Sequence, residues 1–321
     1  MEKVPAAGYK IVGLNIAGLQ RKISPSLFSF PFKVIGSVLK AKKILKEFKP
    51  DIVIGTGGYA SGPMLRAASS KGIPTLIHES NSYPGITNRI LAKKVSKVCV
   101  GMQGMEKYFP KDKLVYTGNP VRQDISGIEQ KKKAGLEFFG YKGDKKIVLV
   151  VGGSLGAKGI NEAVGSNLSQ LAENNIELLW QTGKPYFETA KQQAAAFADQ
   201  NIKVVDFIAK MDLAYAIADV IISRAGAGAV SEICIIKKPS ILVPLPTAAE
   251  DHQTQNALSL VKRNAAILVN ESEAKQKLVQ EAVDLIKNEL HQKELSQNAG
   301  MLAMPRAAEI IVEVAFALLK K

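Results

Sequence analysis

Short apolar runs alternate along the whole chain with longer stretches that carry apolar residues at helical spacing. Runs of three to six residues are typical of buried parallel strands, and the longer stretches are typical of helices that cover such a sheet. In the first half, the pattern predicts strands at residues 9–14, 51–54, 75–78 and 97–100 and helices at 31–48 and 63–70. In the second half, it predicts strands at residues 147–151, 177–180, 203–205, 220–222 and 240–243 and a helix at 160–174.

The alternation occurs twice, and a chain of 321 residues is long enough for two domains that each bury a core. We therefore expect an α/β protein with parallel sheets and helices on both faces of each sheet. The polar stretch 126–144 is interpreted as the region that joins the domains, and residues 305–319 form a last helix with no strand after it.

The composition narrows the class of protein. Cys99 and Cys234 both lie in apolar runs, which indicates small core residues in a reducing compartment, and neither has a second Cys or a His at the spacing of a metal site. The chain contains no apolar run that could span a bilayer, and its first ten residues lack the apolar centre of a signal peptide. We expect a cytoplasmic protein without a bound metal or cofactor.

Most of the positive charge lies in the first half of the chain. Residues 1–124 hold 20 Lys and Arg against 7 Asp and Glu, a net charge of +13, whereas residues 125–321 hold 23 against 22, a net charge of +1. An excess confined to one half indicates that this half faces an anionic ligand or surface. Nucleic acid, an anionic membrane and a phosphorylated ligand all fit the charge, but no nucleic-acid recognition motif accompanies it.

A glycine turn follows the predicted strand at 147–151. The sequence VGGSLGA at residues 151–157 differs from GxGxxG, and no acidic residue follows the next strand, so a nicotinamide site is disfavoured. A turn between strand and helix presents free backbone N–H groups to a phosphate, but it also meets the simpler need for glycine dihedrals. By itself, the loop does not distinguish a phosphate site from a tight turn.

Two further strand ends in the second half carry residues that suit a phosphorylated sugar. The run VIISRAGAGAVSE places small residues at a helix start, with Arg224 able to offset phosphate charge and Glu232 able to accept hydrogen bonds from two sugar hydroxyls. The run VPLPTAAEDHQTQN adds Gln253 and Asn256 as neutral hydrogen-bonding groups. Ligands of such sheets bind at the carboxyl ends of strands, which favours a binding site over an ordinary surface Arg and Glu.

Two strand ends in the basic half carry polar clusters. GTGGYASGP, at residues 55–63, is a second candidate phosphate cradle. HESNSYPG, at residues 78–85, gathers His78, Glu79 and Asn81, which together could form the polar wall of a site. Taken alone, His78 is better explained as a strand-end histidine with a satisfied hydrogen bond.

Residues 22–40 combine aromatic and aliphatic side chains with Lys and Arg. This combination suits the surface of an anionic bilayer, where each Lys or Arg contributes about 1 kcal/mol. A core-facing helix with a solvated Lys face fits the spacing equally well. The charge of the basic half favours membrane contact.

Six motifs follow one another in an order that resembles one enzyme family. GTGGYASGP, HESNSYPGITN, TGNPVR, VGGSLGA, SRAGAGAVSE and DHQTQNA occur in the order seen in the bacterial lipid-linked N-acetylglucosaminyltransferases of peptidoglycan synthesis. The resemblance implies inverting transfer of N-acetylglucosamine from UDP-N-acetylglucosamine to the 4-hydroxyl of undecaprenyl-pyrophosphoryl-N-acetylmuramoyl-pentapeptide. It also implies a glycosyltransferase B fold, in which two doubly wound Rossmann-like domains face each other across a cleft.

The same resemblance divides the chain into an acceptor domain, residues 1–121 and 305–321, and a donor domain, residues 122–304. It implies a peripheral protein on the cytoplasmic side of the inner membrane, with other cell-wall synthesis proteins as further partners. The family opens with a strand, a GGTGGH loop and a helix, none of which this chain contains. We therefore expect an incomplete acceptor domain, and weak or no activity if these residues are the whole product.

The resemblance also assigns roles to individual residues. The implied donor-binding residues are Asn81, Arg122, Ser154, Asn161, Phe207, Ile208, Arg224, Gly226, Ala227, Gly228, Ala229, Val230, Ser231, Glu232 and Gln253. The implied acceptor-binding residues are Gly57, Gly58, Tyr59, Ser61 and Gly62. Among them, Ser154 would contact the UDP phosphates, residues 207–208 would border the uracil, and Glu232 would hold the ribose. Gln253 and Asn81 would contact the N-acetylglucosamine.

In the implied reaction, the acceptor hydroxyl attacks C1 of the sugar while UDP leaves. Helix N-termini and Arg224 would stabilise the charge on the leaving diphosphate. The histidine of the GGTGGH loop, which the family is proposed to use, has no counterpart here. His78 and Glu79 are therefore the candidate catalytic bases.

Three alternatives stay open. Another UDP-sugar enzyme of the same fold, such as a diacylglycerol glycosyltransferase or a UDP-N-acetylglucosamine 2-epimerase, would use the same donor half. A chain that binds the UDP-sugar or a membrane without turnover would carry the same motifs. Nucleic-acid binding rests on charge alone.

Overall fold

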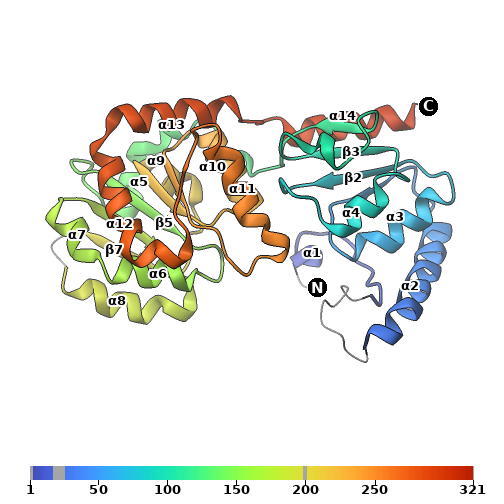
Figure 1. The fold of residues 1–321 in the computed structure, drawn as a ribbon, viewed down its shortest axis with the longest axis horizontal. Helices are drawn as coiled ribbons and strands as arrows, with labels where there is room; N and C mark the ends of the chain where they lie inside the picture. Colours follow the sequence, from blue (N-terminus) through green and yellow to red (C-terminus); the bar gives the residue numbers. More distant parts are fainter. Residues whose placement is uncertain (1–2, 17–25, 198–200, 321) are drawn as a thin grey trace.

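Two α/β domains lie side by side (Figure 1) in the computed structural model, which describes residues 3–16, 26–197 and 201–320. The smaller domain contains α1 (Lys3–Ala6), α2 (Ser26–Phe48), β1 (Val53–Gly55), α3 (Ser61–Ser69), β2 (Thr75–Glu79), α4 (Ile86–Leu91), β3 (Lys97–Val100), β4 (Leu114–Tyr116) and α14 (Ala307–Leu319). The larger domain contains α5 (Lys132–Phe139), β5 (Ile147–Val151), α6 (Lys158–Gly165), α7 (Leu168–Glu173), β6 (Glu177–Gln181), α8 (Phe187–Ala195), β7 (Ile202–Val205), α9 (Met211–Ile217), β8 (Val220–Ser223), α10 (Ala227–Ile236), β9 (Ser240–Leu242), α11 (His252–Val261), β10 (Ile267–Leu268), α12 (Glu271–Lys287) and α13 (Glu289–Met301).

Every strand pairing found in the described part of the chain is parallel. The larger sheet has the order β10-β9-β8-β5-β6-β7, so the direction of winding reverses between β5 and β8. The smaller sheet has the order β1-β2-β3-β4, in which the described strands follow chain order. The prediction of an α/β chain with two parallel sheets is confirmed, and the reversal marks a doubly wound sheet in the larger domain.

Helices cover both faces of the smaller sheet, which explains why its strands are continuous apolar runs. In β2, Leu76 packs with Cys99 and with Ala315 of α14, whereas Ile77 packs with Leu65 of α3 on the other face. Figure 1 shows how the chain leaves α13 on the larger domain and crosses to place α14 on the smaller one. The last helix was therefore predicted correctly, and the domain that it covers contains β2 and β3.

Both cysteines are free and buried, as their apolar surroundings predict. Burial raises the pKa of the Cys99 thiol and of the Cys234 thiol to about 12. Neither sulfur is an activated nucleophile, because the thiolate is the reactive form.

Residues 9–14 do not form the predicted strand. No strand pairs with them among the described residues, and Tyr9 and Val12 are 71% and 62% exposed. Side chains of α2 instead donate hydrogen bonds to the backbone here. Lys40 Nζ donates to the carbonyl oxygen of Gly13, and Ser37 Oγ donates to the carbonyl oxygen of Asn15. An apolar run becomes a strand only when another strand is in place to bond to it.

The polar stretch 126–144 is not a joining region, and this prediction was wrong. Ile128 and Tyr141 are buried in the core of the larger domain. Gly135 of α5 lies so close to α9 that a Cβ at this position would be 2.7 Å from the carbonyl oxygen of Leu213. The stretch therefore covers one face of the larger sheet with its few apolar residues and exposes Lys132, Lys133 and Lys142 to solvent.

The predicted helix at 160–174 is divided into α6 and α7. The division falls at Ser166 and Asn167, where the Asn167 amide nitrogen donates to the carbonyl oxygen of Ala163 at 2.8 Å. Asparagine side chains compete in this way with the hydrogen bonds of a continuous helix. The other predicted strands and helices are present, and the largest difference is at α2, which begins at Ser26 instead of residue 31.

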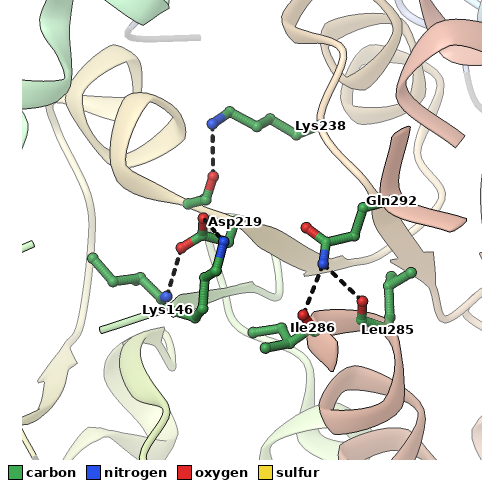
Figure 2. A network of polar contacts seen from close by, with 8 residues as sticks. Lys146, Asp219, Lys238, Leu285, Ile286 and Gln292 are labelled. Carbon is green, nitrogen blue, oxygen red and sulfur yellow. Dashed lines mark hydrogen bonds and ion pairs between the residues drawn. The ribbon is translucent and has the colours of Figure 1, made fainter. Parts of the chain in front are cut away.

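Polar contacts hold the first residues of β5 and β8 at the edge opposite the glycine loops (Figure 2). The Asp219 carboxylate accepts a hydrogen bond from the backbone N–H of Ile147 at 2.8 Å and pairs with Lys146 Nζ at 3.7 Å. Lys238 Nζ donates to the carbonyl oxygen of Ala218 at 2.7 Å, and burial lowers the pKa of Lys238. Gln292 donates to two carbonyl oxygens in the last turn of α12. The contacts of Asp219 and Lys238 hold the starts of the two central strands, and those of Gln292 join α13 to the end of α12.

Candidate functional site

In the larger domain, the loops predicted to bind a phosphorylated sugar lie next to one another because of the strand order. β5, β8 and β9 are neighbours in the larger sheet. Glycine-containing loops follow the carboxyl ends of β5 and β8, and the proline-containing loop 243–251 follows β9. The winding reverses between β5 and β8, and ligands of doubly wound sheets usually bind at the carboxyl ends of the strands at such a reversal. The fold thus brings together three motifs that are far apart in the sequence.

The loop after β5 is a tightly built turn with an exposed tip. Gly156 has φ +76° and lies against the loop after β6. A Cβ at Gly156 would be 1.9 Å from the carbonyl oxygen of Thr182 in that loop. Gly153 also has a positive φ, of +84°, but a Cβ there would meet no atom within 4 Å. Ser154 and Leu155, between the two glycines, are exposed. Glycine dihedrals are therefore required here, and the turn leaves the Ser154 hydroxyl accessible to a ligand.

The loop after β8 leads directly into α10. Gly226 is the N-cap residue with extended backbone, at φ −64° and ψ 148°. The residues around it leave space, because a Cβ at Gly226 or Gly228 would meet no atom within 4 Å. Ala227 and Ala229 are partly exposed, whereas Val230 is buried. The first turn of α10 thus leaves its backbone N–H groups open to a ligand, without bulky side chains in the way.

Arg224 is not the free cation that the sequence suggested. Its Nη1 donates to the carbonyl oxygens of Val243 and Pro244, at 3.1 Å each, and its Nη2 pairs with the carboxylate of Glu271. The charge of Arg224 is therefore balanced within the protein. In this geometry, Arg224 joins the loops after β8 and β9 to the start of α12, and a phosphate would have to compete with Glu271 for it.

Glu232 lies one turn into α10 and has protein partners on both carboxylate oxygens. Tyr215 Oη donates to one oxygen at 2.7 Å, and Arg122 Nε donates to the other at 3.1 Å. Burial, and then the nearby Glu232, raise the pKa of the Tyr215 phenol well above its usual value, so the hydroxyl stays a hydrogen-bond donor. The Glu232 side chain is 16% exposed. Sequence reasoning missed Tyr215, because no motif surrounds it.

Asn161 is placed differently from what the resemblance implies. It is 1% exposed, its amide nitrogen donates to the carbonyl oxygen of Thr182 at 2.8 Å, and its oxygen accepts from Trp180 Nε1 at 3.0 Å. Direct contact with a sugar donor does not fit this geometry. The side chain instead ties α6 to the end of β6, because a buried amide needs partners within the protein.

The remaining donor-side residues are divided between surface and core. Phe207, after β7, is 58% exposed, whereas Ile208 beside it is 4% exposed and packs in the core. Gln253, near the start of α11, accepts a hydrogen bond on Oε1 from the backbone N–H of Leu245 at 3.0 Å. Phe207 is therefore accessible to a flat ligand, whereas Ile208 is not.

Glu79 organises the loop after β2 in the smaller domain. It is 4% exposed. Its Oε1 accepts from the backbone and side-chain nitrogens of Asn81, at 3.0 and 3.3 Å, and its Oε2 accepts from the backbone of Gly85 and from Asn88 Nδ2, at 3.0 and 2.8 Å. A carboxylate with four accepted hydrogen bonds holds its loop in one conformation.

His78 is buried and bonded on both sides of its ring. Its Nε2 lies 3.0 Å from the carbonyl oxygen of Gly118 and therefore donates to it, and its Nδ1 lies 3.4 Å from Ser80 Oγ. The side chain is 5% exposed, and burial lowers the pKa of His78. This is the satisfied strand-end histidine that the isolated sequence favoured, and its contacts weigh against a catalytic role.

A cavity of about 990 Å³ opens beside Glu79, mostly within the smaller domain. Four of the five predicted acceptor-binding residues line it, namely Gly57, Gly58, Tyr59 and Gly62. The fifth, Ser61, donates from Oγ to the carbonyl oxygen of Gly58 at 2.9 Å and so shapes the loop. Glu250 and His252 of the larger domain also border the cavity.

The outer wall of this cavity is apolar and basic. Ile35 and Leu39 of α2 are 57% and 60% exposed, and Ile90 of α4 is 65% exposed. Lys42 and Arg66 line the same cavity. Side chains of residues 22–31, which belong to the predicted membrane-binding stretch, lie outside the described residues. In the described ranges, no helix has the length and apolar character needed to cross a membrane.

Comparison with known proteins gives a consistent result. Residues 147–311 match the Glycosyltransferase family 28 C-terminal domain, and residues 1–100 match the N-terminal domain of the same family. The UDP-N-acetylglucosamine--N-acetylmuramyl-(pentapeptide) pyrophosphoryl-undecaprenol N-acetylglucosamine transferase of Cytophaga hutchinsonii is 52% identical over 316 residues, covering 98% of this chain and 85% of that protein. The protein of the same name from Bacteroides thetaiotaomicron is 49% identical over 315 residues, with the same coverage.

Solved structures agree with the sequence matches. The crystal structure of MurG from Acinetobacter baumannii has a TM-score of 0.79 at 31% identity and covers 97% of this chain and 86% of its own. The UDP-GlcNAc 2-epimerase of Neisseria meningitidis, bound to UDP-GlcNAc, has a TM-score of 0.62 at 17% identity, over 95% of this chain and 84% of its own. The second likeness shows the fold alone.

Proposed function

We propose a reaction for this chain on the premise that it belongs to glycosyltransferase family 28. The chain transfers N-acetylglucosamine from UDP-N-acetylglucosamine to undecaprenyl-pyrophosphoryl-N-acetylmuramoyl-pentapeptide, the lipid intermediate of peptidoglycan synthesis. The observation that carries this proposal is the 52% identity to a transferase of that name over 98% of the chain. The geometry supports it, because phosphate-type loops lie at the switch point of one domain and a large cavity lies in the other.

The sugar donor is proposed to bind the larger domain at the ends of β5, β8 and β9. The open first turn of α10 would hold the diphosphate with its backbone N–H groups, and the exposed Ser154 hydroxyl would bond to a phosphate oxygen. Glu232, held in place by Tyr215, would accept from the ribose hydroxyls. Gln253 and Asn81 are proposed to contact the N-acetylglucosamine.

The proposed chemistry is displacement at C1 of the sugar. The acceptor 4-hydroxyl oxygen forms a bond to C1 as the bond from C1 to the diphosphate oxygen breaks, and the electron pair goes to UDP. The backbone N–H groups of α10 stabilise the growing negative charge without rearranging. Of the two predicted bases, Glu79 lines the cavity and is assigned the hydroxyl proton, at the cost of one of its hydrogen bonds. His78, which does not line it, is assigned a supporting role.

The smaller domain is proposed to hold the lipid acceptor and to meet an anionic membrane surface as a peripheral protein on the cytoplasmic side. The exposed apolar residues of α2 and α4 lie beside Lys42 and Arg66 around one cavity. Apolar side chains next to cations suit insertion among anionic headgroups. Contact with other cell-wall synthesis proteins stays a prediction, as does the domain boundary at residues 121 and 122.

The test of the reaction is transfer of labelled N-acetylglucosamine to the lipid acceptor. We expect product that contains both sugars, formed only when the acceptor is present. Formation of UDP-N-acetylmannosamine without acceptor would instead indicate a 2-epimerase, and transfer to diacylglycerol would indicate a lipid glycosyltransferase. UDP binding without any product would contradict the proposed reaction and leave a UDP-sugar-binding chain.

The test of the membrane surface is sedimentation with phosphatidylglycerol vesicles. The double substitution Ile35→Glu and Leu39→Glu should lower the bound fraction at least fivefold, because it places two carboxylates on the apolar wall. Leu290→Glu, at an 83% exposed position of α13 on the larger domain, is the matched control and should bind as the wild type does. Equal losses in both variants would point to general electrostatic repulsion and contradict the proposed surface.

A further inference from the structure

Two buried asparagines connect the larger domain to one short loop of the smaller domain. The loop consists of residues 80–82 and directly follows Glu79. Asn256, in α11, is fully buried, and Asn119, after β4, is 4% exposed. Neither side chain is open to a ligand, and both amide nitrogens donate to groups within the protein.

Asn256 uses the whole hydrogen-bonding capacity of its amide. Its Oδ1 accepts from the backbone N–H and the hydroxyl of Ser82, at 2.9 and 3.1 Å. Its Nδ2 donates to Asn81 Oδ1 at 3.1 Å and to the carbonyl oxygen of Ala225 at 3.2 Å. A primary amide has two N–H groups and an oxygen with two lone pairs, and all four are used here. The three contacts to residues 81–82 join domains across 174 and 175 positions of the sequence.

Asn119 makes a second connection at the other end of the same loop. Its Nδ2 donates to the carbonyl oxygen of Ser80 at 3.0 Å and to Ser231 Oγ in α10 at 2.9 Å. Ser231 in turn donates to the carbonyl oxygen of Ala227 at the start of α10. Gly101 makes room for the asparagine, since a Cβ there would lie 2.0 Å from Asn119 Oδ1.

We propose that Asn256 and Asn119 are positioning residues that couple the sugar-donor site to the loop carrying Asn81. The loop is tied at its start to α10 and at its end to α11, and both helices begin beside the proposed diphosphate and sugar positions. A shift of either helix when UDP binds is transmitted through these bonds to Asn81 and to the neighbouring Glu79. The inference rests on the proposed function for the identity of the ligand.

The first experiment measures amide hydrogen exchange in the ligand-free full chain. Asn256→Ala removes the acceptor of the Ser82 N–H, so exchange at Ser82 should become at least tenfold faster, whereas Leu76 and Ile77 in β2 should keep their wild-type rates. Asn167→Ala is the matched control, because that amide bonds only within the larger domain and should leave Ser82 unchanged. Unchanged exchange at Ser82 in Asn256→Ala would overturn the proposed connection.

The second experiment adds UDP. In the wild type, UDP should slow exchange at residues 80–82 at least threefold. In Asn256→Ala, UDP should bind with a Kd within threefold of the wild type but leave these residues unaffected, and kcat for transfer should fall at least tenfold at a nearly unchanged KM for UDP-N-acetylglucosamine. If Asn256→Ala fails to fold, Ser82→Ala removes only the hydroxyl contact and should show a smaller loss of the same response.

The outcomes separate the coupling from the proposed function. Loss of UDP affinity in parallel with kcat would overturn the positioning role, because the amide would then act in the donor site itself. UDP binding to the wild type without any response at residues 80–82 would overturn the coupling alone. A wild-type chain that does not bind UDP would overturn the proposed function, and the coupling with it.

Discussion

Several side chains that suggest chemistry in the sequence are bonded to other protein groups in the structure. Arg224 pairs with Glu271, Glu79 accepts four hydrogen bonds, and Asn161 is enclosed between Trp180 and Thr182. Such groups cost free energy when buried alone, so the fold supplies partners for them. At this scale, much of the site consists of residues that hold other residues in position.

Tyr215 provides a test of this positioning. Tyr215→Phe removes the hydroxyl that donates a hydrogen bond to Glu232. The loss of this bond costs about 0.5–1.5 kcal/mol, and because Glu232 is then less well oriented, UDP binding should weaken about threefold to tenfold. Isothermal titration calorimetry with UDP measures the change. Tyr141→Phe, which removes a hydroxyl bonded to Leu178 in the same domain, should reduce stability without changing UDP affinity. Equal affinities for UDP in the Tyr215→Phe variant and the wild type would show that Glu232 needs no support.

His78 predicts a contribution to the pH dependence of stability. Burial lowers the pKa of His78 in the folded chain below the usual 6.5, which outweighs the opposite effects of Gly118 and Glu79. The unfolded chain therefore binds more protons, so this contribution to stability is complete above about pH 6.5 and is lost as the pH falls toward the lower folded value. His78→Gln should remove that loss, which amounts to at most about 1.4 kcal/mol per pH unit. Urea unfolding between pH 5 and 8 measures it, and a pH-independent difference between the two chains would contradict it.

Close approaches between backbone segments define the elements of the site. The loop after β5 contacts the loop after β6 through Gly156 and Gly183, both with positive φ. A side chain at either position would push the loops apart, which explains why this turn must contain glycine. The loop geometry thus depends on two glycines that are far apart in the sequence and adjacent in space.

Two glycines in that loop give a matched comparison. Gly156→Ala must displace the carbonyl group of Thr182, so we expect a loss of about 2–3 kcal/mol in the free energy of unfolding and a loss of UDP binding. Gly153→Ala meets no neighbour and should cost only about 1 kcal/mol for its positive φ. Denaturant unfolding and UDP titration measure both. Similar losses in the two variants would mean that backbone strain, rather than the contact with Thr182, governs the loop.

The chain crosses between the two domains twice. The first crossing leads from β4 into the larger domain, and the second leads from α13 to α14 on the smaller sheet (Figure 1). Ala315 of α14 is 8% exposed and packs with Leu76 and Cys99. The last helix is therefore part of the core of the smaller domain, although it is the end of the chain.

This arrangement predicts separate effects on the two domains. Ala315→Glu places a carboxylate in the smaller core and should lower the stability of that domain by about 2–4 kcal/mol. Val312→Glu, at a 50% exposed position of the same helix, should change it little. Calorimetry with and without UDP distinguishes the domains, because a ligand raises the unfolding temperature of the domain that binds it. A uniform shift of both domains in Ala315→Glu would show that they unfold as one unit.

The sequence by itself determined what depends on local spacing. The strands at 97–100 and 147–151 occur where the apolar runs predict them, and the order of the motifs identified the family. The tertiary structure alone decided which groups are free to act. Residues 9–14 lack a pairing strand, and residues 126–144 contribute to the core of the larger domain. Asn256 forms hydrogen bonds to a loop 174 positions away. Side-chain periodicity is a local property, whereas hydrogen-bond partners and ion pairs are supplied by segments that only folding brings together.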